Sequence, residues 1–157
     1  MEMEIHTQRL RITPCTEKVL QITSRADGYE IAPHVKNYLE EYRIDPSLMG
    51  WGVWVVIDKE EEKIVGDIGF KGKPDCKRTV EVGYGVVPSA QNKGYATEAV
   101  RAIIDWALTS VNVEKILAEC HVDNIASIRV LERINMQKCK HDKEMLKWQL
   151  NKLLDER

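Results

Sequence analysis

The chain has 157 residues and a formal net charge of −2, with 23 Lys plus Arg against 25 Asp plus Glu. This length favours one domain, and a hydrophobic content of 43% is enough for a buried core. The charge balance excludes a protein that binds nucleic acid through a broad basic surface. The longest apolar run, 53–57, is too short to cross a membrane, and residues 1–5 lack the apolar stretch of a secretory signal. We therefore expect a single domain over residues 1–157, located in the cytoplasm, with neither nucleic acid nor membrane as partner.

The cysteines and histidines form no recognisable metal or disulfide pattern. No two cysteines lie closer than 19 positions, and the histidines lack HExxH spacing. Thiols in cytosolic proteins normally stay reduced. No metal site is therefore predicted from the residues concerned, which are Cys15, Cys76, Cys120, Cys139, His6, His34, His121 and His141.

Periodicity in the first third of the chain predicts one strand and two helices. Residues 9–12 alternate polar and apolar side chains, which is typical of a strand, and Pro14 is expected to stop it. Thr16 stands where the N-cap of a short helix is expected. A second helix is predicted over 33–43, with Pro33 in its first turn.

The middle of the chain predicts three strands and then a helix. The strands are expected over 52–57, 63–70 and 78–87, separated by a charged reversal and a Pro-Asp turn. A helix is expected over 95–109, because its apolar residues recur at helical spacing along one continuous face.

The last third predicts a strand over 116–122, a helix capped by Asn124 and ended by Asn135, and one or two strands within 136–150. The inward side chains of this helix are expected to be Ile125, Ile128, Leu131 and Ile134. The element order is β-α-α-β-β-β-α-β-α-β. This order indicates a mostly antiparallel start followed by one strand–helix–strand crossover.

Segment 81–98, EVGYGVVPSAQNKGYATE, carries the clearest functional signal. A strand runs through a short loop into a helix that begins close to Gly94. The first turn of a helix leaves main-chain N–H groups unpaired, and the helix dipole favours an anion there, so a diphosphate can bind without many basic side chains. Gly94 allows close approach of the backbone, and Ala96 keeps the next contact small. Gly83 and Gly85 indicate a bulge or a close approach by a ligand or another backbone.

Together with three other stretches, this segment resembles the GNAT superfamily of N-acetyltransferases, and within it the RimJ/RimL branch, which acetylates protein N-termini. The similar stretches are TQRLRI, IVGDIGF, VEVGYGVVPSAQNKGYATEAVRAIIDWA and VDNIASIRVLER, and the resemblance as a whole extends over roughly residues 7–137. The resemblance implies an α/β, three-layer sandwich with a central, mixed, mostly antiparallel, twisted sheet of six to seven strands and helices on both faces. It also implies acetyl-coenzyme A (acetyl-CoA) as cosubstrate.

The resemblance assigns contacts with acetyl-CoA to particular residues. Val86 and Val87 would offer backbone groups to the pantetheine arm and the thioester, at a gap where the strands ending near Val87 and Val122 splay apart. Asn124 would hydrogen-bond the pantetheine as well as cap its helix, and Ser127 would lie near the same arm. The main-chain N–H groups that would wrap the diphosphate belong to Gln91, Asn92, Lys93, Gly94, Tyr95 and Ala96. The Lys93 side chain would add charge to a phosphate or would be an ordinary solvated lysine.

The implied reaction is direct acyl transfer, in which a neutral amine attacks the thioester and coenzyme A (CoA) leaves as a thiolate. Backbone N–H groups near Val87 would stabilise the oxyanion. Glu81 is the candidate catalytic base, because strand alternation places it on the same face as Gly83 and Gly85. The alternative for Glu81 is an ion-paired or solvent-facing carboxylate on a strand.

A proton donor for the thiolate is harder to assign. Many members of the superfamily have a tyrosine seven residues after the asparagine that corresponds to Asn124, and Leu131 stands there in this chain. The thiolate would then take its proton from water or from another group, and Tyr84 and His121 are the nearest options along the sequence.

The acceptor is expected to lie across the splayed strands from CoA, with walls formed by segment 26–50 and the final strands. Acidic and aromatic residues there suit a cationic amine: Tyr29, Glu30, Tyr38, Glu40, Glu41, Tyr42 and Trp51. The leading interpretation is an N-acetyltransferase for a protein or peptide N-terminus. The alternatives are an acetyltransferase for a small amine, such as a polyamine or an aminoglycoside, and a non-catalytic acyl-CoA-binding module. A homodimer is common for this fold.

Overall fold

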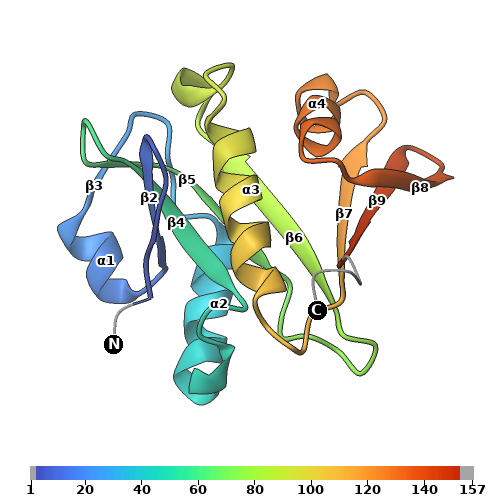
Figure 1. Ribbon diagram of the computed structural model, residues 1–157. Helices are drawn as coiled ribbons and strands as arrows, with labels where there is room; N and C mark the ends of the chain where they lie inside the picture. The colour runs from blue at the N-terminus through green and yellow to red at the C-terminus, as the bar shows by residue number, and fades with distance from the viewer. Residues whose placement is uncertain (1–2, 153–157) are drawn as a thin grey trace.

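One twisted sheet of nine strands runs through residues 3–152, the part of the chain that this computed structural model describes (Figure 1). The strand order is β1-β2-β4-β5-β6-β7-β9-β8, and β3 adds to β5 outside this path. Along the path every neighbouring pair is antiparallel except β6 and β7, which are parallel. The strands are β1 (Ile5–His6), β2 (Leu10–Pro14), β3 (Ser24–Arg25), β4 (Val53–Asp58), β5 (Lys63–Phe70), β6 (Thr79–Val86), β7 (Lys115–His121), β8 (Gln137–Asp142) and β9 (Met145–Asn151).

Four α-helices and two short 3-10 helices connect these strands. They are α1 (Glu17–Ile22), α2 (Pro33–Ile44), η1 (Pro46–Leu48), η2 (Pro88–Ala90), α3 (Tyr95–Leu108) and α4 (Ile125–Arg133). Local sequence explains several of their ends. The Thr16 hydroxyl accepts a hydrogen bond from the Val19 N–H at the start of α1, and α2 begins at Pro33. Asn135, with a φ of 66°, adopts the left-handed conformation just after α4.

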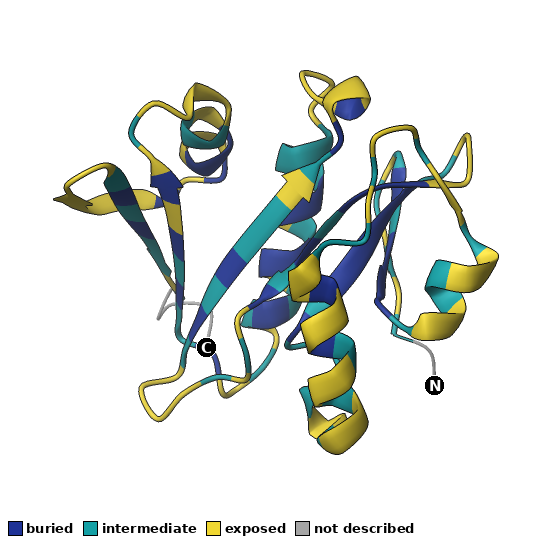
Figure 2. Cartoon of the chain, turned by 180° about the vertical axis from the view of Figure 1, so that it is seen from behind, coloured by how far each residue is buried: buried dark blue, intermediate teal, exposed yellow. Residues whose placement is uncertain are grey.

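Two hydrophobic cores lie on opposite faces of the sheet. The larger core lies between the sheet and helices α3 and α4, and it includes fully buried Val100, Ile103 and Leu131. The smaller core lies under α2, where Val35 and Tyr38 pack against β4. Figure 2 shows the result: the inner side of α3 is buried, and the outer side of α2 is exposed. The α/β class and the helices on both faces are therefore confirmed.

The sheet is larger than the predicted six to seven strands, because β1 and β3 each contribute only two residues and leave no periodicity to detect. Pro14 was expected to stop the first strand, and β2 ends at this residue, which still pairs with Trp54 of β4. Ile125 was predicted to face inward and is 54% exposed, because it is the first residue of α4 and precedes the part of the helix that reaches the sheet.

Within residues 3–152, no helix combines the length and the apolar character needed to cross a bilayer. In the same range, no group of three or more His, Cys, Asp or Glu side chains is arranged to hold a metal ion.

Candidate active site

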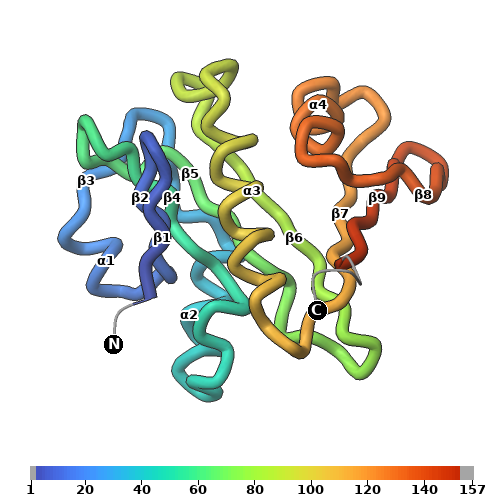
Figure 3. Tube along the Cα trace, viewed as in Figure 1, coloured from blue at the N-terminus to red at the C-terminus, as the bar shows by residue number. Residues whose placement is uncertain are grey.

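The sheet opens between its two parallel strands. β6 and β7 pair over only three residue positions, from Thr79↔Lys115 to Glu81↔Leu117. Beyond that point the strands diverge toward the ends where the loop before α3 and the start of α4 lie (Figure 3). The predicted splay between these strands is therefore present, and it leaves main-chain groups of β6 without a strand partner on this side.

Alternation along the ladder decides which groups of β6 face the opening. The Val87 N–H donates a hydrogen bond to the Val65 oxygen of β5, at 2.8 Å. The N–H direction alternates from one residue to the next along a strand of an antiparallel ladder. Because the Val87 N–H points toward β5, the N–H groups of Val86 and Tyr84 point away from β5 and into the opening. β5 therefore engages the N–H of Val87, and the N–H that faces the opening at the end of β6 is that of Val86. The Val86 carbonyl oxygen accepts a hydrogen bond of 3.1 Å from the Gln91 side chain.

The loop before α3 turns its main-chain N–H groups outward. Asn92 and Gly94 have φ angles of 63° and 80°, in the left-handed region that glycine adopts without strain. Gly94 is the N-cap of α3. In the first turn that follows, the N–H groups of Tyr95, Ala96 and Thr97 donate no hydrogen bond to an acceptor within residues 3–152. This end of α3 therefore has the unpaired donors and the dipole orientation that favour an anion.

Arg9 holds this loop in place, and no local pattern in the sequence predicted this contact. Its guanidinium donates to the Lys93 carbonyl oxygen at 2.7 Å and to the Glu98 carboxylate at 2.8 Å, and it lies 4.4 Å from the centre of the Tyr95 ring. The Arg9 N–H and the Thr7 hydroxyl also donate to Glu98. The side chain thus adds a positive charge beside the start of α3 and ties that start to β2.

Replacing Glu98 by glutamine is expected to destabilise the fold at neutral pH. Burial raises the pKa of Glu98, but the hydrogen bonds from Thr7 and Arg9 together outweigh it and lower the pKa below its usual value. A carboxyl with a lowered pKa stabilises the folded state above its unfolded-state pKa of about 4.3, and this contribution is lost as pH falls through the folded-state pKa. We expect a loss of about 1 kcal/mol at pH 7, because half-exposed Arg9 is screened by solvent.

Urea unfolding of Glu98→Gln and the wild type at pH 7 and at about pH 3.5 checks this expectation, since the difference should shrink at acid pH. Glu132→Gln, which changes an exposed carboxylate of α4, is the control and should behave as the wild type at both pH values. A Glu98 effect that is equal at both pH values would contradict the electrostatic explanation.

The start of α4 lies across the opening from the end of β6. The Asn124 side-chain oxygen accepts a hydrogen bond from the Ser127 N–H at 3.1 Å, so the predicted cap is present and the Asn124 amide NH2 stays available. Tyr84 projects from β6 on this side, and its buried hydroxyl has no hydrogen-bond partner within residues 3–152. Burial raises the pKa of Tyr84, against a smaller opposite effect of nearby Ser127. Leu131 is fully buried in the core.

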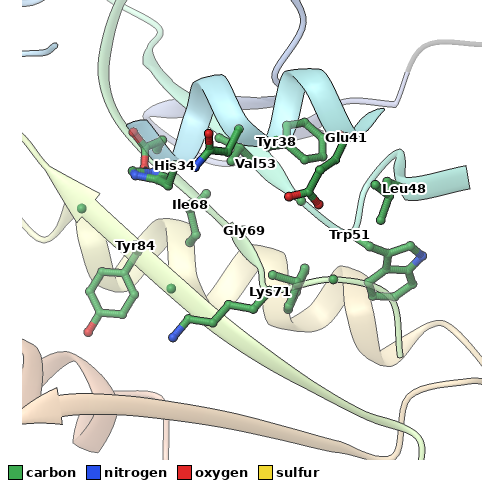
Figure 4. A pocket seen from close by; sticks show the side chains of 17 residues that line it. His34, Tyr38, Glu41, Leu48, Trp51, Val53, Ile68, Gly69, Lys71 and Tyr84 are labelled. Carbon is green, nitrogen blue, oxygen red and sulfur yellow. The ribbon is translucent and has the colours of Figure 1, made fainter. Parts of the chain in front are cut away.

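A pocket of 590 Å³ lies on the opposite face of β6, under α2. Its walls come from α2, from the chain between η1 and β4, and from β5 and β6. Figure 4 shows Tyr38 and Glu41 on α2 and the Tyr84 ring on the far side of β6. Three of the predicted wall residues, Tyr38, Glu41 and Trp51, line this pocket. The final strands, which were also expected to form a wall, do not line it, because they lie beyond the opening between β6 and β7.

The floor of the pocket is a strip of glycine on neighbouring strands. Asp67 pairs with Gly85, and Gly69 pairs with Gly83, so these four residues share one face of the sheet. A Cβ atom added at Gly83 or Gly85 would meet no atom within 4 Å. The two glycines therefore keep open a space that any side chain would occupy.

Opposite ends of this strip carry different polar groups. At one end Glu81 forms an ion pair with Lys71, with 2.6 Å between Lys71 Nζ and Glu81 Oε2. At the other end Asp67 accepts hydrogen bonds from the Tyr29 hydroxyl at 2.9 Å and the His34 ring at 3.0 Å. Neither Asp67 nor the position of His34 was predicted, since no local pattern connects residues 33 positions apart.

Similar proteins are acetyltransferases. The chain is 33% identical over 109 residues to YjdG, an uncharacterized N-acetyltransferase of Bacillus subtilis, covering 69% of this chain and 63% of that protein. It is 31% identical over 84 residues to the ribosomal-protein-serine acetyltransferase of Escherichia coli, covering 54% of this chain and 46% of that protein. The chain thus spans less than two thirds of the length of these relatives. A spermidine N-acetyltransferase from Vibrio cholerae, solved with CoA and spermine, shares the fold at 16% identity, with a TM-score of 0.71 over 92% of this chain and 96% of the other.

The model of the acetyltransferase (GNAT) domain matches residues 14–137, well over half of the chain. The matched range contains the opening between β6 and β7, the start of α3, the start of α4 and the glycine-floored pocket. The chain therefore belongs to the GNAT acetyltransferase family.

Proposed function

We propose that this GNAT acetyltransferase transfers the acetyl group of acetyl-CoA to the N-terminal α-amino group of a protein or peptide, as in the RimJ/RimL branch. The observation that carries the proposal is the arrangement of two sites about β6. The unpaired N–H groups and the start of α3 lie at the opening between β6 and β7, and the pocket lies on the other face of β6. Donor and acceptor can therefore approach one strand from opposite sides.

On the donor side, the unpaired N–H groups fit the acetyl-CoA contacts that the sequence predicts. The start of α3 at Gly94, Tyr95 and Ala96 would hold the diphosphate, and the Asn124 amide and the Val86 N–H would hold the pantetheine arm. Acetyl-CoA supplies an activated acyl group that an amine can attack. The chain's own contribution on this side is to bind and orient that group.

The charges of the pocket favour an acceptor with a single ammonium group. The Asp67 carboxylate is hydrogen-bonded to Tyr29 and His34, and Lys71 is ion-paired with Glu81. Glu41 is the lining carboxylate that forms no ion pair within residues 3–152. One unpaired carboxylate complements an N-terminal α-amino group better than a polyamine with several charges. The name of the Escherichia coli relative is consistent with this acceptor class.

Glu81 is the base that the sequence predicts for the acceptor amine, and it would take the proton of the amine through a water molecule. Glu81 alternates with Gly83 and Gly85 along β6, and its side chain is 26% exposed. If this carboxylate is the base, Glu81→Gln lowers turnover at neutral pH and leaves the affinity for acetyl-CoA nearly unchanged.

Two measurements test the proposal. Acetyl-CoA should raise the melting temperature, because a ligand that binds only the folded state stabilises it. Release of CoA should then be measured with peptides that carry a free N-terminus, with the same peptides acetylated at the N-terminus and bearing one lysine, with spermidine, and with an aminoglycoside. We expect transfer to the free N-termini only.

The other outcomes are informative. Transfer to spermidine or to the aminoglycoside alone would contradict the N-terminal acceptor and support a small amine. A thermal shift without transfer to any amine would support a non-catalytic acyl-CoA-binding module. Absence of a thermal shift at saturating acetyl-CoA would contradict the donor site itself.

A further inference from the structure

His34, Asp67 and Tyr29 form a polar cluster at one end of the pocket floor. Asp67 is the shared acceptor: Tyr29 donates to one carboxylate oxygen and His34 Nε2 bonds to the other, at 2.9 and 3.0 Å. The Asp67 side chain is 14% exposed, whereas that of His34 is 60% exposed and lines the pocket. A sheltered carboxylate thus holds an accessible imidazole at the pocket wall.

The cluster lies closer to the opening of the sheet than Glu81 does. Asp67 pairs with Gly85, the residue immediately before Val86, whose N–H faces the opening. Glu81 lies where β6 still pairs with β7, and four residues of strand, about 13 Å, separate it from Gly85. Its carboxylate is also engaged by Lys71.

We propose that His34, oriented by Asp67, takes the proton from the acceptor amine in place of Glu81. This inference rests on the proposed acetyl transfer. An ionised carboxylate only accepts hydrogen bonds, so His34 Nε2 carries the hydrogen that bonds to Asp67. His34 Nδ1 is then the unprotonated nitrogen, with a lone pair for the proton of the amine. Asp67 is a positioning residue that fixes this tautomer, and Tyr29 holds Asp67.

His34, the amine, the thioester and water account for every bond and proton in the acetyl transfer. His34 Nδ1 first takes one proton from the ammonium form of the acceptor, which gives a neutral amine and a transient imidazolium paired with Asp67. The amine nitrogen forms a bond to the carbonyl carbon of the acetyl group, and the carbon–sulfur bond breaks with its electron pair on sulfur. The second proton that the nitrogen loses reaches the sulfur through water, and His34 returns its proton to solvent, to which its exposed side chain has access.

The charged groups around His34 lie on neighbouring elements. Asp67 on β5 bonds to its ring, and Glu41, on the same helix as His34, lines the same pocket. Lys71 is ion-paired with Glu81 at the far end of the floor. Tyr29 contacts Asp67 rather than His34, and its pKa is raised by burial and then by Asp67, so it stays neutral.

The test compares His34→Gln with Glu81→Gln under matched conditions. The glutamine at position 34 can still bond to Asp67 but cannot accept a proton, and the exposed position should tolerate it. We expect His34→Gln to lower kcat about a hundredfold at pH 7, the scale of a positioned general base. The acceptor KM and the thermal shift by acetyl-CoA should stay within about twofold. The loss should shrink above about pH 9, where the α-amino group is already neutral.

Two further variants separate catalysis from structure. Asp67→Asn should lower kcat, because the tautomer of His34 is no longer fixed, and it should shift the acid limb of the pH–rate profile, because the negative charge beside the imidazole is lost. His34→Ala should be partly rescued by added imidazole. His141→Gln, at the exposed edge strand β8, is the control and should match the wild type.

An active wild type with an unaffected His34→Gln variant would refute this inference alone. If Glu81→Gln lowered kcat and His34→Gln did not, Glu81, the base predicted from the sequence, would be supported in place of His34. A wild type that binds acetyl-CoA but acetylates no amine would refute the proposed function, and the role of His34 with it.

Discussion

Replacing Gly83 by valine is expected to lower kcat/KM for the acceptor more than about tenfold, or about 1.4 kcal/mol, while the fold and acetyl-CoA binding are kept. A Cβ at Gly83 meets no atom within 4 Å, and its φ is negative, so the backbone tolerates a side chain. Valine also favours strands. Its methyl groups would fill the floor of the 590 Å³ pocket instead.

Three measurements check the effect of Gly83→Val: the melting temperature without ligand, the thermal shift by acetyl-CoA, and the KM of the acceptor. The melting temperature and the thermal shift by acetyl-CoA should match those of the wild type, and the KM of the acceptor should rise. Gly69→Ala is the matched contrast on the neighbouring strand, because a Cβ there would lie 1.8 Å from the Gly52 oxygen, so this variant should lose stability. An unchanged acceptor KM in Gly83→Val would show that the pocket is not the acceptor site.

Replacing Trp54 by alanine is expected to lower the free energy of unfolding by about 3–5 kcal/mol. Trp54 is fully buried, and its ring packs 5.0 Å from that of Trp106, between centroids. Its indole N–H donates to the Gly50 oxygen at 2.9 Å. The truncation would leave a cavity and an unpaired carbonyl group between β4 and α3. Because the free energy of unfolding of a domain is typically only about 5–15 kcal/mol, this substitution would remove a large part of it.

Urea titration measures this loss as a lower midpoint with an unchanged slope. Trp54→Phe keeps most of the apolar surface and should cost less than the alanine variant. Ile125→Ala removes a side chain that is 54% exposed and should change the midpoint little. Equal losses in Trp54→Ala and Ile125→Ala would contradict the assignment of the core to this aromatic contact.

Signals confined to a few neighbouring residues predicted the helices and most of the strands. The helical spacing of Ala99, Val100, Ile103 and Ile104 predicted α3 and its buried face. Thr16 and Asn124 predicted helix starts, because a cap acts on N–H groups only two or three residues away. The strand of 63–70 has the bounds predicted for it.

Contacts between distant segments left no such signal. Arg9 and Glu98 are 89 residues apart, and neither position differs locally from an ordinary surface charge. For the same reason the sequence did not show which main-chain N–H groups near Val87 face the opening, because their direction depends on the register between β5 and β6 and not on residue type.

The amino-acid sequence by itself determined the order of elements, the α/β class and the glycine-marked start of α3, because periodicity, caps and turns act over a few residues. The family resemblance implied a splay between β6 and β7, and the tertiary structure placed it after three residue pairs. Only the tertiary structure decided that Gly83 and Gly85 floor a pocket and that Asp67 holds His34 beside it. These features depend on strand register and on which segments pack across the sheet, and a linear pattern does not encode either.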